Sequence, residues 1–374
     1  MATVIGSKAP QVTKLFHELP AEVAPSFPQP WPALLVPRVE IEAEIGRLVD
    51  LERRPNARRA SEIAHPRSLE TGPSVTPGLS ISINVVRPGE QVELYRDNAS
   101  RVEFVIQGDG RATIGTSTLP MTKWCVLSVP SMTKRLYRND GNEPLVWLSY
   151  SNVPLLQRVG AYYSDDRISL PRPPLSQRSE IEQRYVAENA PDIPILHDGA
   201  RLRGYEFFTD IEVAENKPLV WPWSETSPHL CREKGDGKRV LLLLVNPVTG
   251  KAQGTTHSFF AALSRTPAGV RVPVPPRGHK HSSFAVNYHF EGNGESIVDG
   301  QHLEWEAGDL MLSAPSWGEH AHGFTGASVL TVQDHPFHLG MESLIWQEDM
   351  NGPILTLGAE EGQTGYVGPR QTGD

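Results

Sequence analysis

The chain is 374 residues long, carries a formal net charge of −9 and contains two cysteines. This length is enough for two ordinary domains with buried cores, so neither disulfides nor a metal ion is needed to keep the chain folded. The acidic balance argues against a nucleic-acid or anionic-membrane partner, and the longest apolar run, residues 240–245, is far shorter than the roughly 20 residues of a membrane helix. Because we also find no secretion signal and no disulfide framework, we expect a cytoplasmic protein with a small-molecule partner.

The N-terminal segment, residues 1–75, is predicted to be an arm followed by a helix. Its first part is rich in proline and lacks a sustained period. Further along, Ile41, Ile45, Leu48 and Leu51 recur at helical spacing on one face, with charged residues on the other. This pattern indicates an amphipathic helix whose apolar face packs against the body of the protein.

Beyond the helix, the sequence consists of short β-rich runs separated by Gly, Pro, Asn and Asp, and this rhythm occurs twice. Such runs are typical of a small antiparallel barrel or jelly roll. The proline-rich stretch between the two carries Trp, Tyr and Phe residues that need burial, which favours an ordered connector. The predicted fold class is therefore mostly β, with two antiparallel β-barrel or jelly-roll domains after a helical N-terminal segment. The predicted units are a first β unit at residues 76–155, a connector at 156–238, a second β unit at 239–348 and a flexible tail at 349–374.

The second β unit repeats a local pattern of the first about 180 residues later. The stretch RGHKHSSFAVNYHFEGNG at residues 277–294 aligns with LYRDNASRVEFVIQGDG at residues 94–110. In this alignment His279 and His281 fall on Tyr95 and Asp97, so the later copy alone carries histidines.

The histidines of the second unit have the spacing of metal ligands. On a β-strand, residues i and i+2 face the same side, so His279 and His281 project two imidazoles into one space. The stretch APSWGEHAHGF places His320 and His322 on one face in the same way, and one of these two can supply a third nitrogen. The spacing therefore predicts a site with three imidazole ligands.

These motifs resemble those of the bicupins of the gentisate dioxygenase family, which includes salicylate and 1-hydroxy-2-naphthoate dioxygenases. The resemblance is strongest in HKHSSFAVNYHFEG, PSWGEHAHG and RPGEQVELYRDNASRVEFVIQGDG, and it extends over most of residues 30–347. It implies that His279, His281 and His320 bind Fe(II), and that an aromatic substrate chelates the iron and its ring is opened by O2. It also implies a homodimer or homotetramer.

The first cupin departs from this family pattern. At the positions of the later histidines it has Tyr95, Asp97 and Arg135, with Tyr137 at the place of His322. Arginine carries a positive charge at all accessible pH values and repels a divalent ion. We expect the first cupin to be free of metal, its polar residues forming either a buried network or a second, metal-free pocket.

Further residues of the second cupin are candidates for the chemistry. His322 is a candidate acid or base, because its ordinary pKa is near neutrality. Trp317 and Trp305 are candidates for flat walls against an aromatic substrate, although the position of Trp305 between two glutamates favours packing.

The substrate carboxylate raises a separate question. The resemblance implies that an arginine at the position of Asn287 binds the substrate carboxylate. An asparagine amide can donate a hydrogen bond to a carboxylate, but it lacks the positive charge and the paired N–H donors of a guanidinium. Either Arg265, Arg271 or Arg277 takes this role, or the substrate is not a simple salicylate-type acid. His289, two residues beyond Asn287 on the same face, is another candidate for substrate binding.

The predicted function is an Fe(II)-dependent, ring-cleaving dioxygenase acting on a small aromatic substrate and O2. Two alternatives stay open. Imidazole ligands also suit Zn, Cu or Ni. The same site with Zn(II), Ni(II) or Mn(II) fits a metal-dependent lyase, isomerase or hydrolase that does not use O2. A binding bicupin that holds a metal without turnover is the other alternative.

Overall fold

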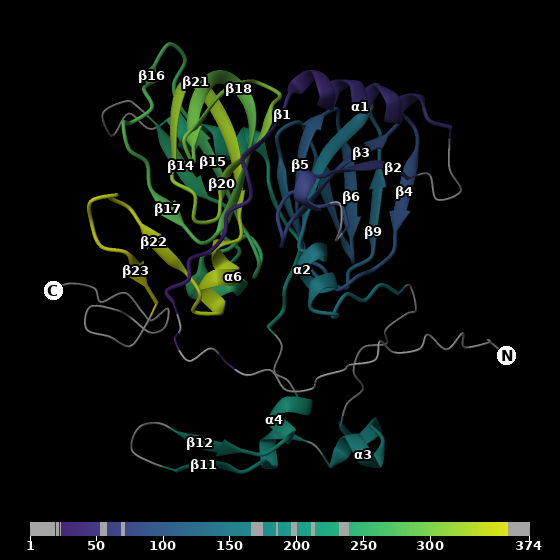
Figure 1. Ribbon diagram of the computed structural model, residues 1–374. Helices are drawn as coiled ribbons and strands as arrows, with labels where there is room; N and C mark the ends of the chain where they lie inside the picture. Colours follow the sequence, from purple (N-terminus) through teal and green to yellow (C-terminus); the bar gives the residue numbers. More distant parts are fainter. Residues whose placement is uncertain are drawn as a thin grey trace, which may run out of the picture.

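The computed structural model is mostly β and contains two β units that lie side by side (Figure 1). This confirms the predicted fold class, with the difference that the sheets form open, jelly-roll-like sandwiches and do not close into barrels. The structure describes residues 19, 22, 24–52, 58–68, 72–165, 175–184, 186–195, 200–210, 214–231 and 239–357.

The first β unit is a sandwich of a six-stranded sheet, in the order β13-β8-β5-β10-β3-β2, and a four-stranded sheet, in the order β4-β9-β6-β7. All neighbouring strands in both sheets are antiparallel. Their bounds are β2 Arg59–Ile63, β3 Ser80–Val86, β4 Gln91–Leu94, β5 Arg101–Gln107, β6 Gly110–Ile114, β7 Ser117–Met121, β8 Val126–Val129, β9 Arg135–Arg138, β10 Leu145–Ser151 and β13 Leu219–Trp221.

The second β unit has an eight-stranded sheet, whose main path runs β1-β20-β18-β21-β15-β14, with β16 paired to β21 and β19 paired to β18. A three-stranded sheet, β17-β22-β23, accompanies it. The bounds are β1 Leu34–Val36, β14 Val240–Leu243, β15 Phe260–Arg265, β16 Arg271–Val272, β17 Lys280–His281, β18 Phe284–Val298, β19 Gln301–Glu306, β20 Leu310–Pro315, β21 His320–Gln333, β22 Ile345–Gln347 and β23 Leu355–Thr356.

The N-terminal segment contacts both units. Strand β1 pairs with β20 of the second unit, and the helix α1, Arg38–Asp50, follows it and covers the first unit (Figure 1). Ile41 and Leu48 of this helix are buried, whereas Ile45 is only partly buried against the same cluster. The amphipathic pattern therefore gives a helix that docks by one apolar face, as the sequence predicts.

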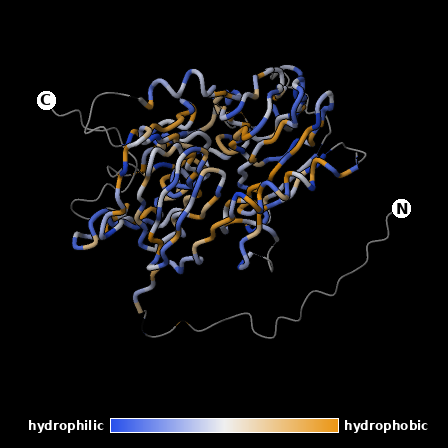
Figure 2. The backbone as a smooth tube through the Cα atoms, turned by 90° about the horizontal axis from the view of Figure 1, so that it is seen from above, coloured by the Kyte–Doolittle hydropathy of each residue, from blue (hydrophilic) through white to orange (hydrophobic). Residues whose placement is uncertain are grey.

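The two units share a hydrophobic core between their large sheets. Phe104 of β5 packs against Tyr288 and Phe290 of β18, with ring centroids 5.9 and 5.4 Å apart. Trp124 of the first unit and Trp223 of the connector also contact Phe290, at 5.1 and 5.3 Å. Because aromatic groups bury large areas, this contact fixes the two units against each other. Figure 2 shows hydrophobic and hydrophilic stretches alternating through both of them.

The connector is partly built into the first unit, since its strand β13 pairs with β8. Another part stands apart from the two sandwiches in Figure 1: the hairpin of β11, Asp192–Pro194, and β12, Arg201–Arg203, with the neighbouring α3 and α4. The remaining helices are short: α2 Val153–Arg158, α3 Glu180–Gln183, α4 Glu206–Thr209, α5 Trp223–Thr226 and α6 His335–Gly340.

The residue bounds predicted for the five units stay a prediction. Much of the predicted tail, residues 358–374, lies outside the described part of the chain, whereas its beginning contributes strand β23. None of the helices in the described ranges combines the length and apolar character that crossing a membrane requires.

Candidate metal centre

Three histidines of the second unit come together at the junction of its two sheets. His281 lies in β17, His320 begins β21, and His279 forms an antiparallel bridge with His320, with N to O distances of 3.1 and 3.0 Å. The ring centroids are 4.4 Å apart for His279 and His320, 4.8 Å for His281 and His320 and 5.6 Å for His279 and His281. One potential ligand atom from each residue lies within 4.8 Å of the other two.

The close approach of the two strands depends on a glycine. A Cβ atom added at Gly278 would collide with the backbone oxygen of His320. A larger residue would therefore push His279 and His281 away from His320. The glycine in the GHKH motif thus brings the imidazole pair to its third partner.

Backbone carbonyls orient two of the rings. The Nδ1 atom of His281 lies 2.9 Å from the oxygen of Ser283, and the Nδ1 atom of His320 lies 3.0 Å from the oxygen of Gly318. A carbonyl only accepts, so these contacts place the proton on Nδ1 and leave the Nε2 lone pair available for a metal.

The same two rings are held neutral. Burial, and then the nearby imidazoles, lower the pKa of His320 to about 4 and hold the pKa of His281 well below its ordinary value. A metal binds the neutral form, so these pKa shifts favour coordination at neutral pH. Small side-chain movements would bring three such nitrogens to the bond length of about 2.0–2.1 Å typical of imidazole on Zn. The residues present therefore fit a metal ion.

Two polar residues that the sequence analysis missed support His281. The amide of Gln333, at the end of β21, donates to the Oγ of Ser283 at 2.6 Å. Its nitrogen also lies 3.3 Å from Nε2 of His281, and a metal bound at Nε2 would replace this contact. Ser283 also contacts Nδ1 of His281 at 3.0 Å. Gln333 lies thirteen residues after His320, at the opposite end of β21. Spacing alone gave no signal for it, because only the pairing of β21 with β18 brings it back to the site.

His322 lies beside the three histidines, with its ring centroid 5.6 Å from that of His320. Its Nδ1 atom is 2.9 Å from the Oγ of Ser296, which also accepts a hydrogen bond from Nε1 of Trp305 at 3.1 Å. Burial, followed by the charge effects of neighbouring groups, holds the pKa of His322 well below its ordinary value. The neutral ring is therefore a potential proton acceptor or a hydrogen-bonding partner.

Trp305, Asn287 and His289 lie in the packed interior of the second unit. Trp305 stacks on His289 with centroids 3.8 Å apart and belongs to an apolar cluster with Met311 and Phe324, in agreement with its predicted packing role. Asn287 accepts a hydrogen bond from Thr331 at 2.8 Å. His289 is fully buried, and its Nε2 atom has no partner among the described residues.

The other predicted substrate-binding residues lie near the surface. Arg277 donates from Nε and one Nη to the carboxylate of Glu319, both at 2.9 Å, and its side chain is 61 % exposed. Trp317 is partly buried, and the ammonium group of Lys280 lies 4.6 Å from its ring centroid. The guanidinium of Arg277 is thus engaged outside the histidine cluster.

Arg239 is a cation near the site that the sequence analysis missed. Its guanidinium lies 4.1 Å from the ring centroid of Phe324 and donates to Ser264 at 3.0 Å, while its buried Nε has no partner among the described residues. Burial lowers its pKa to about 10, so it stays charged at neutral pH, and this charge contributes to the lowered pKa values of His289 and His322. Arg239 precedes a β-rich run and has no motif spacing to mark it.

The first unit presents a different cluster at the corresponding positions. Asp97 pairs with Arg101 through two hydrogen bonds of 2.6 and 2.7 Å and with Arg135 at 3.0 Å. The side chain of Tyr95 is largely exposed, whereas Tyr137 is fully buried and donates to Glu103 at 2.6 Å. The expected buried polar network is therefore present there.

The fold and the site together define a bicupin with an all-imidazole candidate metal centre in its second cupin. The chain is 26 % identical over 273 residues to a 1-hydroxy-2-naphthoate 1,2-dioxygenase from Nocardioides sp. (strain KP7), covering 70 % of this chain and 63 % of the relative. It is 23 % identical over 260 residues to a gentisate 1,2-dioxygenase from Ralstonia sp., covering 68 % of this chain and 65 % of the relative. The matched stretch thus spans less than two thirds of the length of these two relatives.

A solved structure has a similar fold. The salicylate 1,2-dioxygenase from Pseudaminobacter salicylatoxidans superposes with a TM-score of 0.65 at 17 % identity, covering 84 % of this chain and 88 % of that one. No family model matches the chain. The resemblance to the gentisate, salicylate and 1-hydroxy-2-naphthoate dioxygenases is therefore confirmed by relatives in sequence and by a neighbour in fold.

Proposed function

We propose that this protein is an Fe(II)-dependent dioxygenase that opens the ring of a hydroxylated aromatic substrate with O2. The observation that carries the proposal is the cluster of His279, His281 and His320, three imidazoles within ligand distance of one another. The names of the relatives support it, since they are 1,2-dioxygenases acting on gentisate or 1-hydroxy-2-naphthoate.

In this proposal His281 and His320 hold the metal by their Nε2 atoms, and His279 holds it by one of its two ring nitrogens. Bound iron would supply adjacent open positions for a chelating substrate and O2 and a path for electrons between them. The protein contributes placement: Gly278 permits the strand approach, and Ser283 and Gln333 fix the ring of His281. Such outer partners orient the ligands and tune their basicity.

His322 is the proposed proton acceptor for the substrate hydroxyl. If its Nδ1–H donates to Ser296, then Nε2 keeps a lone pair next to the histidine cluster. Trp305, which donates to the same hydroxyl, holds Ser296 in place. His322 would then take the hydroxyl proton at Nε2 while the substrate binds.

Arg239 is the cation that we assign to a substrate carboxylate. Its buried Nε without a partner among the described residues, its position against Phe324 and the effect of its charge on the pKa of His322 suit this role. Arg277 is less suitable, because Glu319 already occupies its guanidinium. Trp317, Asn287 and His289 stay proposed contacts that position the ring or support the pocket wall.

Metal analysis combined with oxygen uptake tests the proposal. The full-length chain is purified without oxygen, loaded with Fe(II), and supplied with gentisate, salicylate and 1-hydroxy-2-naphthoate. We expect about one iron per chain and O2 consumption with at least one of these acids. We expect His279→Ala to lose both properties, and His302→Ala, which changes an exposed histidine paired with Glu295, to keep them.

Three results would overturn the proposal. Iron retained by His279→Ala would place the ion elsewhere, and iron-loaded protein that consumes no O2 with any of the three acids would remove the dioxygenase assignment. Equal turnover of an aromatic acid by Zn(II)-loaded protein without O2 would establish a lyase, isomerase or hydrolase instead. The homodimer or homotetramer also stays a proposal, and light scattering of the full-length chain measures it.

A further inference from the structure

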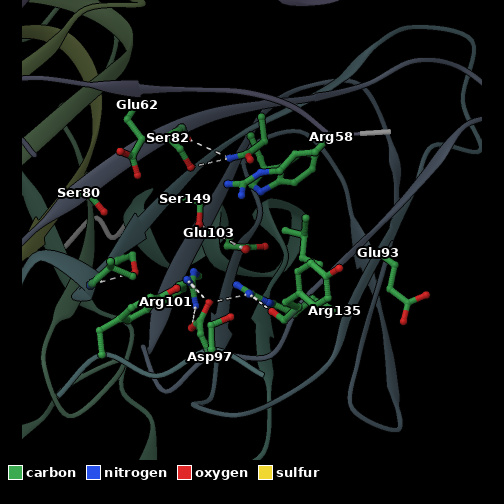
Figure 3. A pocket seen from close by; sticks show the side chains of 18 of the residues that line it. Arg58, Glu62, Ser80, Ser82, Glu93, Asp97, Arg101, Glu103, Arg135 and Ser149 are labelled. Carbon is green, nitrogen blue, oxygen red and sulfur yellow. Dashed lines mark hydrogen bonds and ion pairs between the residues drawn. The ribbon is translucent and has the colours of Figure 1, made fainter. Parts of the chain in front are cut away.

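The first cupin contains a cavity of about 370 Å³ at the position that corresponds to the metal centre of the second (Figure 3). Its wall is formed by inward-facing residues that alternate along the strands. Ser80, Ser82 and Asn84 come from β3, and Ser149 and Ser151 come from β10. This wall offers hydroxyl and amide groups where a pocket for an apolar ring would offer hydrocarbon.

Three guanidinium groups border this cavity. Arg101 and Arg135 both bind Asp97, and the Nε of Arg135 is buried without a partner among the described residues. Arg58 lies at the exposed side of the cavity, close enough for the charges of Arg135 and Arg101, after burial, to lower its pKa.

Two of the acidic groups around the cavity are already engaged with cations. Asp97 is shared between two arginines, and Glu93 at the rim pairs with Lys134. Burial raises the pKa of Glu62 and of Glu103. The buried Nε of Arg135, which has no partner among the described residues, is a donor that suits one negatively charged group of a ligand.

Glu103 provides the second feature of the cavity. Its side chain lies at the centre of the pocket in Figure 3 and is almost fully buried. The Oε1 atom accepts from Tyr137 at 2.6 Å, but the Oε2 atom has no partner in the described part of the chain. A buried carboxyl oxygen without a partner is destabilising, so a ligand hydroxyl that bonds it is favoured.

We propose that the first cupin binds a small aliphatic hydroxy acid without a metal. The ligand carboxylate accepts hydrogen bonds from the Nε of Arg135 and from Arg58, one hydroxyl bonds Oε2 of Glu103, and further hydroxyls face the serines of β3 and β10. The positive charge of Arg135, which takes the place of His320, excludes a cation from the same spot.

Binding measurements with a matched set of probes test this site. Calorimetry of the full-length chain is carried out with D-gluconate, with D-glucitol, which lacks the carboxylate, and with hexanoate, which lacks the hydroxyls. We expect gluconate to bind at least about 10-fold more tightly than either of the others, because it alone satisfies both the arginines and Glu103. Affinity should be the same with Fe(II) bound and after chelation, because the site does not use the metal.

Two variants locate the binding. Arg58→Gln and Glu103→Gln should each weaken gluconate binding about 10-fold. Arg111→Gln should leave it unchanged, because Arg111 is an exposed arginine of the same cupin that pairs with Asp140 outside the cavity. Circular dichroism checks that each variant is folded.

The proposal fails if the three probes bind equally or not at all, or if Arg58→Gln and Glu103→Gln both bind gluconate like the unchanged protein. It also fails if chelation abolishes gluconate binding, since the ligand would then occupy the metal centre. None of these results bears on oxygen uptake, so this site and the dioxygenase assignment can fail separately.

Discussion

The two cupins place different chemistry at the same structural position. In the second, His279, His281 and His320 offer three nitrogens to a common point. In the first, the corresponding residues include Asp97 and Arg135, which form an ion pair of 3.0 Å. In both cupins the β sandwich directs side chains from two neighbouring segments toward the same position in its interior. The identity of those side chains then decides whether this position attracts or repels a cation.

The difference also has an energetic side. Burial keeps His281 and His320 neutral, so their cluster needs no internal counter-charge and retains free lone pairs. In the first cupin the buried charges of Asp97, Arg101 and Arg135 would each be costly to bury without a partner. Their ion pairs offset this cost. We expect the second cluster to be adapted to bind a metal, and the Asp97 cluster to hold the first cupin together.

The largest expected effect on stability follows from removing the shared carboxylate. Asp97→Ala leaves Arg101 and Arg135 buried without their partner, so the free energy of unfolding should fall by about 3–5 kcal/mol. Urea denaturation measures this change. The exposed pair of Arg111 and Asp140 provides the control, because Asp140→Ala should change stability far less.

Metal content of the same variant sharpens the comparison. Folded Asp97→Ala protein should bind as much Fe(II) as the unchanged chain, because the ion is assigned to the second cupin. A loss of iron in this variant would place the ion in the first cupin and reverse the assignment.

The next largest effect is expected on metal affinity, when Gln333 no longer supports His281. Gln333→Leu removes the hydrogen bond that holds Ser283 against Nδ1 of His281, and metal affinity should fall about 10- to 100-fold. Competition with a chelator of known affinity measures it. Gln301→Leu, on the exposed part of β19, should bind metal normally, and equal affinities in the two variants would contradict the role of Gln333.

His289 gives the second cupin a dependence on pH that the first does not share at the corresponding position, Val105. Burial lowers the pKa of His289 to about 3 from an ordinary value of 6.5. Between these two pH values His289 binds a proton in the unfolded chain but not in the native state. The contribution of the neutral ring to the free energy of unfolding is therefore fully present above about pH 6.5 and is lost as the pH falls. From pH 6.5 to 5 the loss is about 2 kcal/mol, at about 1.36 kcal/mol per pH unit.

Replacement by an uncharged ring tests this dependence. His289→Phe keeps a ring against Trp305 and should remove this share of the acid sensitivity, measured as unfolding free energies at the two pH values. His302→Phe, at an exposed histidine, should keep the full loss. An unchanged pH slope in His289→Phe would show that His289 is protonated in the native state at pH 5.

Local patterns in the sequence were sufficient to predict the fold class and the meeting of the three histidines. The alternation of His279 and His281 puts them on one face, and the helical spacing of Ile41 and Leu48 predicts a buried helix face, as the structure has it. These predictions succeed because the direction of the side chains repeats at a fixed interval along a strand or a helix.

Features that depend on register between distant strands were not predictable in this way. Gln333 reaches His281 only because β21 runs back along β18. Similarly, the partner of Arg277 proved to be Glu319, 42 residues away across the bridge that joins His279 to His320. Sequence spacing could not identify Arg239 as the candidate for binding the substrate carboxylate. The choice among the arginines depends on which guanidinium is buried in the fold, and spacing does not determine this.

The smallest expected effect concerns this choice of arginine. Arg239→Lys keeps the positive charge but removes the free Nε donor, so the KM for an acidic aromatic substrate should rise about 10-fold, with a smaller change in kcat. Steady-state oxygen uptake measures both constants. Arg277→Lys is the matched control, since its guanidinium is held by Glu319 and its side chain is mostly exposed. A rise in KM for Arg277→Lys without one for Arg239→Lys would assign the substrate carboxylate to Arg277 and show that the substrate displaces Glu319 from its guanidinium.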